Sequence, residues 1–439
     1  MKKIVVSVIV FAAGAIAPPP CLSQSLPPVR QLGPITAVAH DSMSSVSGIR
    51  ALSNGRLLVN DIVGRRVLLL DSALTLVSVV ADTTSATANA YGTRPGGLIA
   101  FHGDSTLFVD PGSLSMLLID PNGKIARVMA ARGQDAGFLV GGPFGAAGFD
   151  PSGKLVYRAP PNFQALARSP GANGLPPVPQ PPESAAIVRF DLASRKLDTA
   201  TFFKTPKIVM NVTRSADGGV RVISSMNPLP QGDDWALLPD GTIALVRTRD
   251  FHIDWLAPTG TVTSSPKIPF PWERLTDSGK VAFIDSARVA MEKARASGQF
   301  GFGGPGGPGG AGGIQVTFGA AGPARDGGGA ARPNVTTTTA APPGQLPPLQ
   351  MIQPTELPDY KPAFLPGSTR VDADGNLWIR TTQNANARPV YYVINSKGEV
   401  VDRVQLPANR VLVGFGSGGV VYLAVRDAGT AHLERARVR

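Results

Sequence analysis

Short apolar runs, each entered through a tight turn, recur six times along the chain. Several of these turns carry Asn-Gly or Asp-Gly, which supply the positive φ that a hairpin turn needs. The pattern therefore predicts a repeated unit that opens as strand, turn, strand. The second strand is the clearest part of the repeat, and in five of the six units it begins on glycine. These second strands are predicted at 55–59, 105–109, 153–157, 241–245, 375–379 and 419–423.

A third apolar strand follows roughly ten residues later in each unit, and in three units a Gly-bearing turn and a fourth strand come next. Four antiparallel strands repeated at a spacing of roughly forty residues are typical of a β-propeller, because one four-stranded blade cannot bury both of its faces alone. The sequence thus predicts an all-β protein, a six-bladed propeller within 29–438. The blades are expected at about 45–82, 95–130, 144–203, 232–270, 365–406 and 408–438.

The sixth unit ends after its third strand, whereas an extended segment at 29–38 belongs to no blade. We expect this segment to supply the missing outer strand and to close the ring, which removes an open sheet edge.

The repeat resembles that of six-bladed β-propellers of the NHL-repeat type, within the TolB-like superfamily. Their blades read Asp-x-x-Gly-x-Leu-x-Val, then an apolar run ending in Asp and another Gly turn, as at 150–157 and 372–379 here. The charged position before the third strand is variable in this chain, and two long insertions interrupt the pattern. The resemblance implies the fold but says little about function, since this architecture hosts lyases, lactonases, sensor domains and binding platforms.

Two segments interrupt the repeat in the first half of the chain. Residues 158–184 are rich in proline and are expected to project as a loop from the mouth of the ring. Residues 204–231 contain a hairpin, with strands at 209–212 and 220–223, which we interpret as an insertion because third and fourth strands are missing. A seven-bladed ring is the alternative.

The longest insertion spans 271–361. Thr276 is suited to cap a helix at 276–295, which has an imperfect apolar face. The Gly- and Pro-rich stretch 298–348 has too little apolar surface to offset its ordering entropy, so we predict disorder there. Its role is either a tether to a partner or that of a tolerated surface insertion.

Composition agrees with a loop-rich exported protein: the chain has 50 Gly and 41 Pro among 439 residues, and 17% of its residues are charged. Two lysines followed by an apolar stretch too short to span a bilayer predict a signal peptide at 1–24 and a periplasmic or extracellular location. Cys21 lies in this segment; lipidation needs a small residue before the cysteine, and the chain has Pro20. The mature chain is predicted to have no transmembrane segment and to be monomeric.

The net charge of +11 falls to +9 when Lys2 and Lys3 leave with the signal peptide. This charge suggests a protein or anionic ligand as partner, or merely a basic surface that keeps the protein soluble. The arginines are scattered, without a basic run interleaved with aromatic residues, so nucleic-acid binding is not expected.

Catalytic signals are weak. The four histidines, His40, His102, His252 and His432, occupy different places in their repeats and are not expected to share a metal. A nucleophile elbow is not expected in the Gly-Ser-Gly-Gly turn at 416–419, because it joins two strands rather than a strand and a helix.

Two groups of residues are candidates for a site. Asp233 and Asp234 enter the fourth blade side by side and could bind Ca²⁺ or raise one carboxyl pKa; otherwise one caps the loop and the other is solvated. No cofactor is predicted beyond this possible Ca²⁺ site. Arginines expected at the mouth could form a ring that binds a carboxylate or phosphate, or could pair with loop carboxylates of the next blade. They are Arg94, Arg158, Arg249, Arg380 and Arg410.

The sequence favours a non-catalytic binding or scaffold module with an unknown ligand. The alternative is a metal-dependent hydrolase or lyase, lactonase-like, that uses the central channel with Asp233 or Asp234 among its ligands. A third hypothesis is a structural envelope component that reaches its partner through the Gly-rich insertion.

Overall fold

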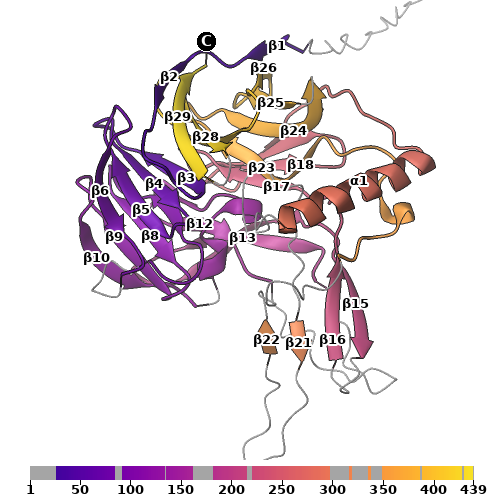
Figure 1. Ribbon diagram of the computed structural model, residues 1–439, viewed down its shortest axis with the longest axis horizontal. Helices are drawn as coiled ribbons and strands as arrows, with labels where there is room; N and C mark the ends of the chain where they lie inside the picture. The colour runs from indigo at the N-terminus through magenta and orange to yellow at the C-terminus, as the bar shows by residue number, and fades with distance from the viewer. Residues whose placement is uncertain are drawn as a thin grey trace, which may run out of the picture.

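The computed structural model describes residues 26–84, 91–133, 135–161, 181–214, 220–296, 316–318, 335–337, 349–385, 388–427 and 430–438. Within these ranges, strands form six four-stranded antiparallel blades arranged in a ring (Figure 1). The predictions of a signal peptide and of Cys21 lipidation concern residues outside the described part of the chain.

The first three blades follow one another along the chain, each with its strands in sequence order. Blade 1 consists of β3 (Val46–Ala51), β4 (Leu57–Asp61), β5 (Arg66–Leu70) and β6 (Leu76–Ala81). Blade 2 consists of β7 (Gly97–Ala100), β8 (Thr106–Asp110), β9 (Ser115–Ile119) and β10 (Ile125–Ala130). Blade 3 consists of β11 (Gly148–Phe149), β12 (Leu155–Arg158), β13 (Ser184–Phe190) and β14 (Leu197–Lys204).

The remaining blades complete the ring. Blade 4 consists of β17 (Asp234–Leu237), β18 (Ile243–Arg247), β19 (His252–Leu256) and β20 (Val262–Ser264). Blade 5 consists of β23 (Phe364–Val371), β24 (Leu377–Ala385), β25 (Arg388–Ile394) and β26 (Val400–Gln405). Blade 6 consists of β27 (Arg410–Phe415), β28 (Val420–Asp427), β29 (Thr430–Arg437) and β2 (Ile35–Val38). First strands of neighbouring blades contact one another, as β3 does β7 and β27, and β17 does β23, so the first strands line the central channel.

The ring is closed by the N-terminal segment, as expected. β2 pairs antiparallel with β29 and is the outer strand of blade 6. The first part of the same segment does something the sequence did not indicate: β1 (Val29–Gln31) adds to the outer edge of blade 5, parallel to β26. There the Arg30 guanidinium forms an ion pair with Asp402. The segment therefore covers the edge of one blade and completes the next.

Each blade interface is filled by its own buried apolar cluster. Phe364 and Tyr392, for example, are fully buried between blades 4 and 5. The cluster between blades 6 and 1 joins Leu433 to Leu57 in the same way. The other four interfaces have equivalent clusters, so each of the six blades packs directly on the next. This continuous packing settles the ring at six blades rather than seven.

The hairpin at 204–231 is part of a separate sheet that stands away from the ring (Figure 1). Its order is β15 (Val209–Arg214), β16 (Val220–Ser225), β21 (Val316–Phe318) and β22 (Val335–Thr337). β21 and β22 belong to the stretch predicted to be disordered, 298–348, and the rest of that stretch lies outside the described residues.

The expected helix is α1 (Asp277–Ala296). Thr276 caps it, since the Gly279 amide donates to Thr276 Oγ1 at 3.2 Å. A small apolar cluster that includes Ile284 and Leu275 packs the helix against a short 3₁₀ turn, η4 (Pro354–Glu356), and the chain around it. No helix in the described part of the chain is long and apolar enough to cross a membrane.

Candidate functional site

The connection from blade 2 to blade 3 covers one end of the central channel. It contains two 3₁₀ turns, η1 (Ala136–Phe138) and η2 (Gly142–Phe144). η2 contacts the inner strand β23 of blade 5, and the Trp235 indole of blade 4 donates from Nε1 to the Phe144 carbonyl at 2.9 Å. A segment that starts beside blade 3 and touches the inner strands of blades 4 and 5 must pass over the channel. We call residues 135–147 the cover.

Two glycines allow the cover to approach the inner strands closely. A Cβ on Gly145, whose φ is +82°, would lie 2.4 Å from Trp235 Nε1. A Cβ on Gly97, in β7, would lie 2.5 Å from the Val140 Cα. Real Cβ atoms do not come this close to other heavy atoms, so any larger residue would push the cover away from the ring.

The cover is also tied to blade 3 at its start. The Tyr157 hydroxyl, on β12, donates to Asp135 Oδ2 at 2.5 Å, and Arg132 Nε lies 3.3 Å from the same oxygen. Burial and the neighbouring Asp135 carboxylate raise the pKa of Tyr157, which keeps its hydroxyl protonated as a donor. The cover is thus held at both ends by side chains of the ring.

Arg158 lies beneath the cover. Its guanidinium carbon is 5.9, 5.1 and 5.6 Å from the ring centroids of Phe138, Phe144 and Phe203. Its Nε is buried without a hydrogen-bond partner, and no described residue forms an ion pair with it. Burial lowers the pKa of Arg158 to about 10, although the charge of Asp234 opposes this effect. The site therefore holds a cation on aromatic rings with unused donor capacity.

Asp234 is the acid whose charge acts on the pKa of Arg158, and its side chain is almost fully buried. One carboxylate oxygen accepts from the Trp235 amide at 2.9 Å, and the other accepts from the Thr369 amide of blade 5 at 2.8 Å. Burial raises the pKa of Asp234, while these hydrogen bonds and one from the Gly367 amide act against the rise. The carboxylate joins blades 4 and 5 and does not point into open space.

Asp233 has a different set of partners. It accepts from the amides of Lys204 and Thr248, each at 3.1 Å, and from Arg247 Nη1 at 2.9 Å. Arg247 also donates to Asp254 at 2.7 Å. The two adjacent acids are therefore hydrogen-bonded to different neighbours. Among the described residues, no three His, Cys, Asp or Glu side chains are grouped to hold a metal ion.

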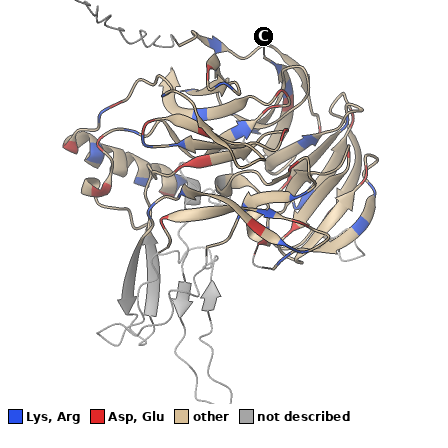
Figure 2. Cartoon of the chain, turned by 180° about the vertical axis from the view of Figure 1, so that it is seen from behind, with Lys and Arg blue, Asp and Glu red and all other residues tan. Residues whose placement is uncertain are grey.

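The other four arginines do not gather around Arg158. Arg94 and Arg249 are exposed in loops, and Arg380 is partly buried on β24 beside Tyr391. Arg410 forms a paired contact with Glu434 of its own blade, at 2.7 and 3.0 Å. In Figure 2, too, the Lys and Arg positions are scattered over several blades. Arg410 is thus paired with a carboxylate, but this carboxylate lies on strand β29 of its own blade and not in a loop of the next blade.

The cover was not predicted from the sequence. Its signal was the run Gly141-Gly-Pro-Phe-Gly145 before blade 3, where three glycines with positive φ allow the chain to turn sharply over the channel. The role of Phe138 could not be assigned from the sequence either, because it depends on a contact with Arg158 of β12.

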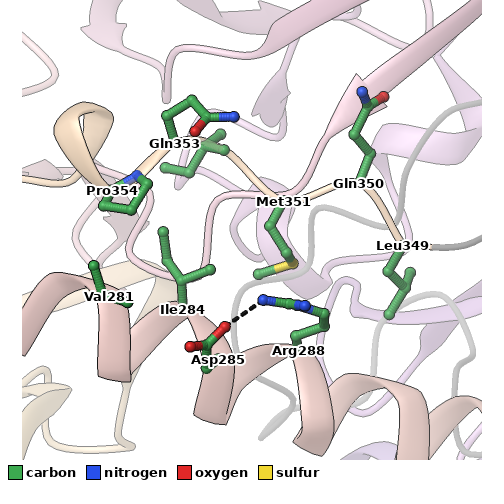
Figure 3. Close-up of a pocket in the computed structure, with 10 residues that line it drawn as sticks. Val281, Ile284, Asp285, Arg288, Leu349, Gln350, Met351, Gln353 and Pro354 are labelled. Carbon is green, nitrogen blue, oxygen red and sulfur yellow. Dashed lines mark hydrogen bonds and ion pairs between the residues drawn. The ribbon is translucent and has the colours of Figure 1, made fainter.

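A second hollow lies outside the ring, between α1 and residues 349–354 (Figure 3). Its volume is about 430 Å³, and Val281 and Ile284 of the helix line one side. Asp285 and Arg288 in its wall form an ion pair with each other. The polar groups of this hollow are therefore already partly satisfied.

No known protein family and no curated protein sequence matches the chain. Solved structures do match it over most of their length. They include a gluconolactonase from Xanthomonas campestris, at 13% identity over 94% of this chain and 99% of that chain, with a TM-score of 0.36. Virginiamycin B lyase from Staphylococcus aureus matches at 9% identity over 90% and 96%, with a TM-score of 0.35. Regucalcin, a calcium-binding protein from Agrobacterium tumefaciens, matches at 14% identity over 94% and 98%, with a TM-score of 0.38. Likeness at this level carries no argument about activity, so the function must be argued from the geometry of this chain.

Proposed function

We propose that the protein is a non-catalytic binding module that holds a small carboxylate or phosphate at the covered end of its channel, with Arg158 recognising the anion. The observation that carries this proposal is the buried Nε of Arg158, which has no hydrogen-bond acceptor among the described residues. A buried donor left unpaired is costly, and an anion would satisfy it through paired, charge-assisted hydrogen bonds. Part of the Arg158 side chain is still exposed, which gives a ligand access.

The acids near this site support binding over catalysis. Asp233 and Asp234 accept hydrogen bonds from backbone amides at both of their carboxylate oxygens. An acid used in this way supports the loops around the site and has little free capacity for proton transfer or for a metal.

The test is the melting temperature in sodium phosphate or sodium acetate, with sodium chloride at equal ionic strength as reference. Ligand binding to the folded state raises the melting temperature by mass action. We expect a rise for the wild-type protein and for Arg249→Gln, an exposed control, but not for Arg158→Gln. Arg158→Lys, which keeps the charge without the paired donors, serves if the Gln variant fails to fold. An equal rise in all variants, or no rise in the wild type, would contradict the proposal.

A second candidate is a lactonase-like hydrolase or lyase in the channel, with Asp234 as the proton donor. The observation in its favour is the raised pKa of that buried carboxyl close to a cation. Turnover of a lactone or ester panel that is lost in Asp234→Asn, retained in Arg249→Gln and dependent on added Ca²⁺ would favour this enzyme. Ca²⁺ as a cofactor, the NHL-type assignment of the blades, and export directed by residues 1–24 stay predictions from the sequence; N-terminal sequencing of the secreted protein tests the last.

A further inference from the structure

A short antiparallel ladder precedes α1, formed by residues 273–275 and 359–361. Arg274 lies opposite Tyr360, the Leu275 amide donates to the Asp359 carbonyl at 2.7 Å, and the Lys361 amide donates to the Glu273 carbonyl at 2.9 Å. Because these bonds flank the Arg274–Tyr360 pair without joining it, the two side chains stand close together on one face.

The two faces of this ladder differ in what they contact. On one face, Lys361 pairs with Glu273 at 2.6 Å, and Lys280 of α1 pairs with Asp359 at 2.6 Å. Leu275 is buried on this side, in the cluster that holds the helix. Since side chains alternate along an extended chain, Arg274 and Tyr360 face away from the helix.

An exposed tryptophan stands next to this outer face. Trp272 precedes Arg274 by two residues and is 41% exposed, and Tyr360 is 49% exposed. The indole packs edge-on against Phe270, with the ring centroids 5.3 Å apart. Phe270 in turn packs against Phe251, inside the interface of blades 4 and 5, with a centroid distance of 5.9 Å. The exposed ring is therefore supported by aromatic rings that reach into the core of the propeller.

We infer that Trp272, Arg274 and Tyr360 form a binding platform for an acidic polysaccharide. Flat aromatic rings can stack on the apolar faces of sugar rings, and a guanidinium binds a uronate carboxylate through paired hydrogen bonds. Arg274 is exposed, and its charge helps to lower the pKa of Asp359, but no described residue lies within ion-pair distance of it. The net charge of +11 favours the approach of a polyanion.

A protein partner is the alternative occupant, because Trp, Tyr and Arg are also enriched at protein interfaces. A stable protein interface covers about 800 Å² on each partner, whereas this platform consists of three side chains. The platform is separate from Arg158, so this inference does not depend on the binding site proposed above.

The fluorescence of the protein offers a specific readout. Trp235, Trp255 and Trp378 are 1%, 8% and 2% exposed, so Trp272 is the tryptophan open to solvent. We expect polygalacturonate fragments to protect the wild-type emission from acrylamide quenching, whereas dextran, a neutral chain, does not. Arg274→Gln should weaken polygalacturonate binding about tenfold, the value of one charge-assisted hydrogen bond. Trp272→Phe should weaken it too, as measured by calorimetry because the fluorescent group is lost.

Arg127→Gln is the matched control, since it removes one exposed positive charge from β10, the outer strand of blade 2. Binding that persists in this variant at the wild-type affinity, and melting temperatures equal to that of the wild type in all variants, would support the platform. An equal loss in Arg274→Gln and Arg127→Gln would mean attraction by net charge alone and overturn the inference. Absence of protection by polygalacturonate would also overturn it.

Discussion

Neighbouring blades of the ring share buried apolar clusters along their whole height, whereas α1 is held by one small cluster around Ile284 and by the ion pair of Lys280 with the exposed Asp359. The ring has no free end, because each blade has a neighbour on both sides and the first and last parts of the chain meet in blade 6. The helix has a packed side and an exposed side. We therefore expect the ring to unfold as a unit and the helix to open locally at lower cost.

Removal of the closing strand should have the largest effect on the stability of the ring relative to that of the helix. Without residues 26–38, β29 has an unpaired edge and blade 5 loses the strand that covers β26. We expect a loss on the order of 5 kcal/mol, because strand pairing and several packed contacts disappear together. Urea unfolding of the truncated chain measures it. If its stability is within 1 kcal/mol of the full chain, the ring does not depend on this closure.

Truncation of a single side chain in a blade interface should have the next largest effect on stability. Phe364→Ala removes a fully buried ring between blades 4 and 5 and should cost about 4 kcal/mol of global stability. Ile284→Ala is the matched change on α1, where hydrogen exchange of the helix amides should accelerate while the global unfolding midpoint changes less. Equal midpoint shifts in the two variants would mean that ring and helix form one cooperative unit.

Arg247→Gln tests a polar contact of the ring. Arg247 pairs with Asp233 and Asp254, whose side chains are 9% and 13% exposed, so its loss leaves two nearly buried acids without their cation. We expect a cost of about 3 kcal/mol in urea unfolding at neutral pH. Arg249→Gln, two residues away and exposed, should change stability by less than about 0.5 kcal/mol. Similar values for both variants would contradict a special role of Arg247.

The smallest expected effect is on the pH dependence of the free energy of unfolding. Burial opposes ionisation of Asp254, but hydrogen bonds from Ser264 and Arg247 outweigh it and lower its pKa. A carboxyl with a lower pKa in the folded state stabilises the fold above its unfolded pKa of about 3.9, and this contribution is lost as the pH falls through the folded pKa. Asp254→Asn should therefore flatten the acid limb of a stability–pH curve. An unchanged slope below pH 4 would argue against this assignment.

The difference between the repeated blades and the segments outside them also explains which parts of the fold could be predicted from the sequence. The blades repeat, and each repeat carries its own turns and apolar strands, so all six and the closing strand could be placed from local patterns. The short strands β21 and β22 could not, because β21 pairs with β16, far back along the chain, β22 pairs only with β21, and neither has a strong apolar pattern.

The candidate site was harder to predict for the same reason. Arg158 was among five arginines chosen by their position in the repeat, and nothing in the repeat separated it from Arg410. What separates them is contact across the fold: phenylalanines of the cover surround Arg158, whereas Glu434 pairs with Arg410. Such partners come from other segments and are not encoded in the spacing of the blade motif.

The pairing of β2 with β29 sets an order on folding. Ile35 lies opposite Ala436, so the last interface joins residues that are separated by nearly the whole chain. The entropy of closing so long a loop must be met before any contact of blade 6 with β2 forms. Blades 1 to 5 can pack on one another as they are synthesised, but the ring cannot close until its final strand is available. Until then, β2 lacks its partner strand, and the apolar sides of blades 1 and 5 that blade 6 covers stay open to other chains, which makes the last step of folding the one most exposed to aggregation.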